Sequence, residues 1–281
     1  MSKIYGTIGF VFLTKGNKKI IVLADQHNTL PECDNKINIG MWFKKKFNSS
    51  KILLEEVPRE NTKLIELWQE SPHTQELKNL YLDNSTLISG TDVRPFMIPF
   101  SWEVLEDINL SDKINNITII EYLKEIDNFF TLQNKYLIDN LSNYNFNNLK
   151  NNLLGNHFLI IKRRFNDFLK DLSINKLLNE KIRFLYNNYN NKLLTVNNLL
   201  DDIMEWYICA QIHIFIDKPI IIHAGLAHTT KIIKLLESHY KYDIKFQEGI
   251  NDLQNAYHGN RVGCINLPDH INIQFGGKNK I

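Results

Sequence analysis

The chain lacks several features that would assign a function directly. Its longest basic run is the triplet Lys44 to Lys46, and 33 lysines and arginines face 31 acids, which leaves a net charge of +2. The sequence therefore has no basic patch of the kind that nucleic-acid binding requires. The N-terminal apolar stretch is interrupted by Gly6 and Gly9, too short for a bilayer, and has no signal-peptide cleavage site. We expect neither nucleic acid nor a membrane as a partner.

Cysteine is scarce, and the usual nucleophile motifs are missing. Cys33, Cys209 and Cys264 are far apart and form no CxxC pair. This spacing argues against a disulfide framework and against a thiolate metal site. There is no GxSxG motif, and no cysteine follows a predicted strand beside histidine or aspartate. We expect a cytoplasmic protein in which water, rather than a side chain, is the nucleophile.

The length and composition favour one large α/β domain over residues 1–281. With 281 residues and 43% hydrophobic content, the chain can bury a full core. Asparagine, isoleucine and lysine are abundant. This composition is typical of proteins from AT-rich genomes and does not indicate a chemical function. Residues 103–216 repeat apolar positions every three or four residues, which predicts several amphipathic helices. We expect this block to be a helical insertion that caps a mostly parallel, helix-flanked sheet.

A buried strand is predicted where Ile20 to Leu23 form an unbroken apolar run. Such a run is typical of a parallel strand covered on both faces. A preceding strand from Ile8 to Leu13 should turn back at residues 15–17. Asp25 and His27 then lie just past the end of the buried strand, at the sheet edge where α/β proteins bind ligands.

Three further apolar runs also stop at charged residues or histidine. They are residues 52–54, 87–90 and 220–222. The last is followed by a predicted amphipathic helix from Lys231 to His239. The polar residues that we assign to the four strand ends are Asp25, His27, Glu55, Glu56, Arg59, Asp92, Arg94, His223 and His228. Charged residues are seldom buried unless they are paired or bind a metal, so this convergence predicts a functional site.

Each residue also has a structural explanation when it is taken alone. A single histidine such as His27 is more often a hydrogen-bonded structural residue. Asp92 and Arg94 can form a surface ion pair of little energetic weight, and the threonines that follow His228 can be helix caps. Adjacent strand residues point to opposite faces, so only one of Glu55 and Glu56 is expected in a given site.

The order of these motifs resembles the superfamily of erythromycin-esterase-like, ChaN-like and TraB/TIKI proteins. The matching residues are AxxH from Ala24 to His27, ExxxR from Glu55 to Arg59, GxD from Gly90 to Asp92, and GxxH from Gly225 to His228. The superfamily has glycine at the position of Ala24. Its members include esterases, metal-dependent peptidases and haem-binding lipoproteins, so the resemblance implies an architecture and a site without a substrate.

The predicted chemistry is hydrolysis of an ester or amide in a small molecule or peptide. In a metal-free version, a histidine takes a proton from water while Glu55 supports the imidazolium. In a metal version, His27, Glu55 and His228 hold one Zn²⁺, Mn²⁺ or Fe²⁺. Arg94 would bind an anionic group or oxyanion, and Asp92 or Asp25 would orient a neighbour. His223 is a further catalytic candidate, and Asp25, Glu56 and Arg59 are assigned to cofactor binding.

Two other functions remain open. Asp25 to Asn28, Gly155 to His157 and His223 to His228 partly echo a dimetal phosphoesterase, although its GD and GHxH motifs are missing. The second alternative is a non-enzymatic binding protein, or a structural protein of viral origin with a degenerate site. Metal content separates them: two equivalents favour the phosphoesterase and one favours the two-histidine site, while none leaves a metal-free hydrolase or a binder.

Overall fold

The computed structural model describes most of the chain as two compact units. The described residues are 2–26, 31, 33–58, 73–107, 110–134, 141, 152–215, 217–256 and 263–276. Unit 1 consists of Met1–Val57, Ser71–Thr91 and Gln211–Ile281, and unit 2 of Pro58–Glu70 and Asp92–Ala210. Among the described helices, none combines the length and the apolar composition needed to cross a membrane.

Unit 1 contains a six-stranded sheet with the order β6-β5-β7-β3-β2-β8. The four strands β6, β5, β7 and β3 run parallel, whereas β2 pairs antiparallel with both β3 and β8. The mixed α/β fold with a mostly parallel sheet is therefore confirmed. The strands are β2 (Gly9–Lys15), β3 (Lys18–Asp25), β5 (Lys51–Leu54), β6 (Ile88–Gly90), β7 (Ile220–Gly225) and β8 (Asp243–Gly249).

The apolar runs of the sequence explain the centre of this sheet. Residues 20–23 of β3 and 52–54 of β5 are fully buried, as expected for strands covered on both faces. The chain turns between β2 and β3 at Gly16, whose φ of 56° is readily adopted by glycine. The observed β3 continues through Asp25, so this residue ends the strand instead of following it.

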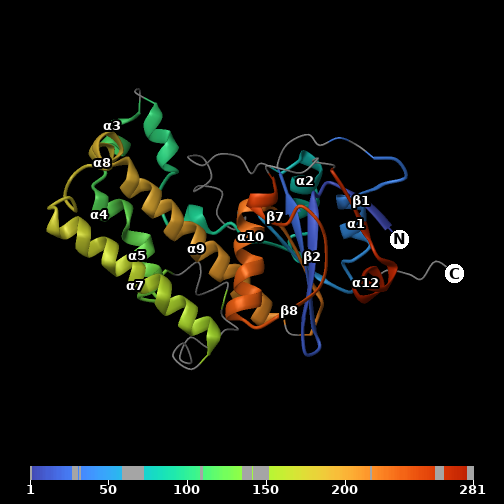
Figure 1. The fold of residues 1–281 in the computed structure, drawn as a ribbon. Helices are drawn as coiled ribbons and strands as arrows, with labels where there is room; N and C mark the ends of the chain where they lie inside the picture. The colour runs from blue at the N-terminus through green and yellow to red at the C-terminus, as the bar shows by residue number, and fades with distance from the viewer. Residues whose placement is uncertain are drawn as a thin grey trace. The chain divides into compact units, whose positions relative to one another are not determined.

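Helices cover both faces of the sheet in unit 1. Leu23 and Ile221 pack in one apolar cluster with Phe43 of α1, whereas Ala24 packs with Leu226 of α10 in another. Because successive strand residues point to opposite faces, α1 and α10 lie on opposite sides of the sheet (Figure 1). The helices of this unit are α1 (Ile39–Lys44), α2 (Gln75–Asp83), α10 (Leu226–Lys234) with the π-helical turn η5 (Leu235–His239), α11 (Leu253–Ala256) and α12 (Asp269–Gln274).

A second, three-stranded sheet pairs the first strand of the described residues with the last. Its order is β4-β1-β9, formed by β4 (Ile37–Asn38), β1 (Ser2–Tyr5) and β9 (Cys264–Leu267). Cys264 begins β9 and forms a disulfide with Cys33, which precedes β4. The expectation of no disulfide is therefore wrong. The two cysteines are 231 residues apart in sequence, and only the pairing of β1 with β4 and β9 brings their segments together.

The described part of unit 2 is helical. Its β pairing is the isolated bridge between Thr118 and Lys181. Phe129, Phe158 and Trp206 pack edge to face or tilted at ring-centroid distances of 5.2 to 5.5 Å, which forms an aromatic core. The α-helices are α3 (Asp112–Asn115), α4 (Ile119–Tyr122), α5 (Lys124–Phe130), α7 (Leu153–Ile174), α8 (Ile182–Asn188) and α9 (Asn190–Ile214, to Ala210 in this unit). The 3-10 turns are η2 (Arg94–Phe96) and η3 (Trp102–Glu106). The role of this block as a cap stays a prediction.

Candidate active site at the carboxyl edge of the sheet

The parallel strands of unit 1 end at one edge of the sheet. Asp25 at the end of β3 lies beside Gly225 of β7, and Leu54 at the end of β5 lies beside His223 of β7. The pairing extends one residue further, because the Glu55 N–H donates to the carbonyl of His223 over 3.1 Å. The pairing of the adjacent strands β5, β7 and β3 therefore places Glu55, His223 and Asp25 at the same edge of the sheet.

Glu55 and His228 form a buried pair at this edge. Glu55 Oε1 lies 3.5 Å from His228 Nε2, and Glu55 Oε2 accepts a hydrogen bond of 2.7 Å from the Gly225 N–H. Both side chains are at most one-tenth exposed. The contact expected for Glu55 is thus present. His228 lies in the first turn of α10, which begins at Leu226, earlier than the predicted start at Lys231.

Glu56 contacts a different histidine. Its Oε1 lies 3.3 Å from His73 Nδ1, and both side chains are at most 1% exposed. Glu55 and Glu56 therefore face different partners, as expected for adjacent residues. The contact of Glu56 with a second histidine was not expected from the sequence. Strand β5 ends at Leu54, so both glutamates lie beyond the strand and each is buried against its own histidine.

Asp25, His73 and His223 gather into one buried group. One ligand atom from each residue lies within 4.8 Å of those from the other two, and His73 Nε2 is 4.0 Å from Asp25 Oδ2. The rings of His73 and His223 are 5.2 Å apart. Two imidazoles and a carboxylate are a ligand set that first-row divalent metals accept. The sequence prediction contained Asp25 and His223 but missed His73.

His73 could not be recognised from the strand-end pattern. It follows no apolar run, and instead lies just before α2, where Thr74 is the N-cap. The available signal was the apolar spacing of Leu77 and Leu80, which predicts a helix that begins close to His73. A histidine before a helix has too many structural explanations to be singled out from the sequence.

Asp92 and Arg94 belong to unit 2, where they form an ion-pair group with Asp201. The Arg94 guanidinium binds Asp92 through two hydrogen bonds of 2.8 and 3.0 Å, and its third contact is with Asp201 at 3.1 Å. Asp92 therefore orients Arg94, as expected. Arg94 is already neutralised by two carboxylates, and its predicted role toward a substrate stays a prediction.

Two predicted site residues lie outside the described residues. They are His27, the histidine of the AxxH motif, and Arg59, the arginine of the ExxxR spacing. The structure therefore describes Glu55 and His228, but not His27, of the predicted metal-binding set.

Other candidate residues have structural roles in the described part of the chain. His157 is buried within helix α7 and follows no strand, so the GNH motif of the phosphoesterase alternative lacks its expected setting. Thr229 and Thr230 donate hydrogen bonds to the carbonyl of Leu226, at 3.2 and 2.7 Å. These threonines bond back to the helix backbone and are not its cap, because Gly225 is the N-cap of α10.

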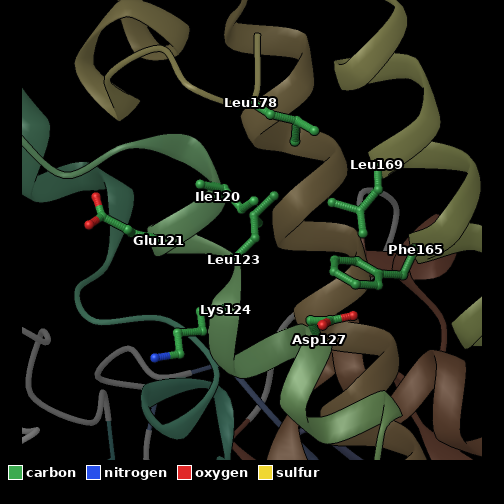
Figure 2. Close-up of a pocket in the computed structure, with 8 residues that line it drawn as sticks. All are labelled: Ile120, Glu121, Leu123, Lys124, Asp127, Phe165, Leu169 and Leu178. Carbon is green, nitrogen blue, oxygen red and sulfur yellow. The ribbon is translucent and has the colours of Figure 1, made fainter. Parts of the chain in front are cut away.

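A pocket of about 290 Å³ lies in unit 2, between the helices α4, α5 and α7. Figure 2 shows the aromatic ring of Phe165 and the side chains of Leu169 and Leu178 lining this pocket, with Glu121 and Lys124 among the polar lining residues. None of its lining residues is a predicted site residue. Its mostly apolar lining is suited to an apolar group and not to acid–base chemistry.

The combined geometry permits two kinds of chemistry at the sheet edge, metal binding by Asp25, His73 and His223 and proton transfer by Glu55 and His228. A carboxylate fixed by a backbone N–H and facing an imidazole, as Glu55 faces His228, can support proton transfer from water. No match to this chain was found. That holds for protein-family models, for curated proteins and for solved structures. The candidate site must therefore be judged from its own residues.

Proposed function

We propose that the chain is a hydrolase that activates water with Glu55 and His228, of the type found among erythromycin-esterase-like and TraB/TIKI-like proteins. The observation that supports this most directly is the buried pair with Glu55 Oε1 at 3.5 Å from His228 Nε2. A carboxylate that accepts the Nε2 proton leaves the lone pair on Nδ1, which can take a proton from water. His27 remains the predicted third member.

The environment of Glu55 supports an orienting role. Its second oxygen is held by the Gly225 N–H at 2.7 Å, so the carboxylate has one fixed direction toward His228. As His228 becomes positively charged during proton transfer, the buried negative charge of Glu55 stabilises it more strongly than water would. No serine or cysteine nucleophile is required, and an ester or an amide in a small molecule or peptide is the proposed substrate.

The test is a screen of the purified chain on chromogenic esters, amides and phosphoesters, followed by Glu55→Gln on any substrate that is turned over. The variant keeps the shape and removes the charge, so kcat should fall by about 10² or more with unchanged circular dichroism. Glu121→Gln is the matched control, since Glu121 caps the exposed start of α4 and lines the separate pocket of unit 2, and it is not a predicted site residue. Turnover by Glu55→Gln equal to that of the control would place the chemistry elsewhere. A chain that binds ligand but turns over no substrate class would favour the non-enzymatic alternative.

The compartment is a separate part of the proposal. The low cysteine content led to the expectation of a cytoplasmic protein, and cytosolic thiols are kept reduced. The Cys33–Cys264 disulfide would persist in an oxidising compartment instead. Alkylation of thiols at the moment of cell lysis distinguishes the two, because a cytoplasmic protein should then show three alkylated cysteines and an oxidised one only Cys209.

A further inference from the structure

We propose that Asp25, His73 and His223 bind one divalent transition-metal ion, at a position separate from the Glu55–His228 pair. The inference deepens the proposed function and rests on it for the role of the ion. One ligand atom from each of the three residues lies within 4.8 Å of the other two, and all three residues are buried. An ion held tetrahedrally at about 2.1 Å separates its ligand atoms by about 3.4 Å. A shift of roughly 1 Å closes the observed triangle around an ion.

Polar contacts favour one nitrogen of each histidine as the ligand for the ion. Glu56 Oε1 lies 3.3 Å from His73 Nδ1 in an ion-pair contact, and a carboxylate so close favours a proton on Nδ1, which leaves the lone pair on Nε2, the atom nearer Asp25. His223 Nε2 lies 3.2 Å from the carbonyl of Gly6, which assigns its proton to Nε2 and leaves the lone pair on Nδ1. Metal-binding histidines commonly donate their second N–H to a carboxylate or a backbone carbonyl in this way.

The remaining ligand is also oriented by a neighbour. Asp25 Oδ1 accepts a hydrogen bond of 2.7 Å from the Gln26 N–H, which directs Oδ2 toward His73. The ring of His223 is further held edge-on by Phe43, at a centroid distance of 5.9 Å. Each of the three ligands is thus fixed by a second group, so little conformational entropy is lost when an ion binds.

The chemistry of the ligands selects the class of ion. Mg²⁺ and Ca²⁺ prefer oxygen ligands, whereas two imidazole nitrogens and one carboxylate suit Zn²⁺, Fe²⁺ or Mn²⁺. Three protein ligands leave a coordination position open for water or substrate. The sequence-based metal set of His27, Glu55 and His228 is different, because in the structure Glu55 is already held by Gly225 and His228.

The two groups lie on either side of the end of β7. His223 lies in register with Leu23 and therefore points to the sheet face covered by α1, whereas His228 belongs to α10 on the opposite face (Figure 1). Glu55 and Glu56 are adjacent in the chain, and each serves one of the two groups. An ion bound by Asp25, His73 and His223 would therefore be coupled to the proton-transfer pair through this glutamate dipeptide and through β7.

The test measures binding of Zn²⁺ and Co²⁺ by the full chain, with titration calorimetry for affinity and visible absorption of Co²⁺ for coordination by nitrogen. We expect one equivalent per chain. Asp25→Asn and His73→Ala should each weaken binding at least 100-fold, and Glu56→Gln, which removes an orienting contact, should weaken it about 10- to 100-fold. His270→Ala is the control at an exposed histidine of α12 and should bind as the wild type does.

Only variants that keep the fold can show whether Asp25, His73 and His223 bind the ion. His223 lies inside strand β7, where a substitution would disturb the sheet, so the test relies on Asp25→Asn and on His73→Ala, with circular dichroism matching the wild type. No Zn²⁺ or Co²⁺ binding by the wild type, or wild-type affinity in both variants, would overturn the proposal. If Glu55→Gln and His228→Ala lost the ion while His73→Ala kept it, the ion would belong to the sequence-predicted set and the proposal would also fail. If Glu55→Gln kept both the ion and full turnover, the metal site would stand and the proposed function would fail.

Discussion

The lysine at the start of β5 should make stability depend on pH. Lys51 is 8% exposed, and its ammonium lies 4.7 Å from the centre of the Phe215 ring. Burial, with a smaller contribution from the nearby charge of Lys218, lowers the pKa of Lys51 from 10.5 to about 8. The folded state therefore releases this proton at a lower pH than the unfolded state. Below pH 8, folding has to bury the charge, and this cost is relieved as the pH rises from about 8 toward 10.5.

The size of the effect follows from the two pKa values. Between pH 7 and 9, a group with a pKa of about 8 when folded and 10.5 when unfolded changes the free energy of unfolding by about 1.3 kcal/mol. Partial solvent screening reduces this to about 1 kcal/mol. Lys46 contributes in the same direction, because burial beside Lys45 also lowers its pKa to about 8. Lys51→Met should therefore remove roughly half of the increase.

The assay is urea unfolding at pH 7, 8 and 9, followed by circular dichroism. The wild type should become more stable as the pH rises, and Lys51→Met should show a smaller rise by about 1 kcal/mol. Lys170→Met, at an exposed position of α7, is the control and should follow the wild type. Identical pH dependence in wild type and Lys51→Met would show that the ammonium is solvated in the folded state, and would refute the reasoning.

Three further changes test other parts of the fold. Cys33→Ser should lower the free energy of unfolding by about 2–4 kcal/mol, measured under non-reducing conditions. A thiol assay that finds three reactive thiols in the unreduced, denatured wild type would contradict the disulfide. Trp206→Phe removes the hydrogen bond from the indole N–H to the carbonyl of Leu154, and should cost about 2 kcal/mol by urea unfolding; an unchanged midpoint would contradict it. Thr118→Ala keeps the backbone N–H and removes the hydroxyl, so it should raise the pKa of Glu121, which the backbone and side-chain hydrogen bonds of Thr118 lower. An unchanged titration by NMR would show that the side-chain hydrogen bond of Thr118 is not formed.

The sequence predicts the central strands well because burial on both faces produces a simple pattern. Residues 20–23, 52–54 and 220–222 are apolar without interruption, and each lies in a parallel strand. The position of Glu55 at a strand end follows from that pattern, and so does its need for a partner. The register that places it beside His223 depends on strand order, which no single run specifies.

The rest of the site depends on contacts between segments far apart in the sequence. His73 reaches Asp25 and His223 from a loop before a helix, where no periodic pattern marks it. Cys33 and Cys264 meet because the first and last strands of unit 1 pair, and their spacing of 231 residues gives no hint of this. Local sequence patterns predict helices and strands, whereas contacts between distant segments of the chain have to be observed in the structure.

The central claim is that Glu55 and His228 act as one unit in proton transfer, and a double-mutant comparison tests it most directly. On a substrate found by screening, kcat/KM is measured for the wild type, Glu55→Gln, His228→Ala and the double variant. We expect a large loss in each single variant, and a double variant hardly worse than His228→Ala, because Glu55 acts through His228. Losses that multiply in the double variant, or single variants that keep full activity, would contradict the account.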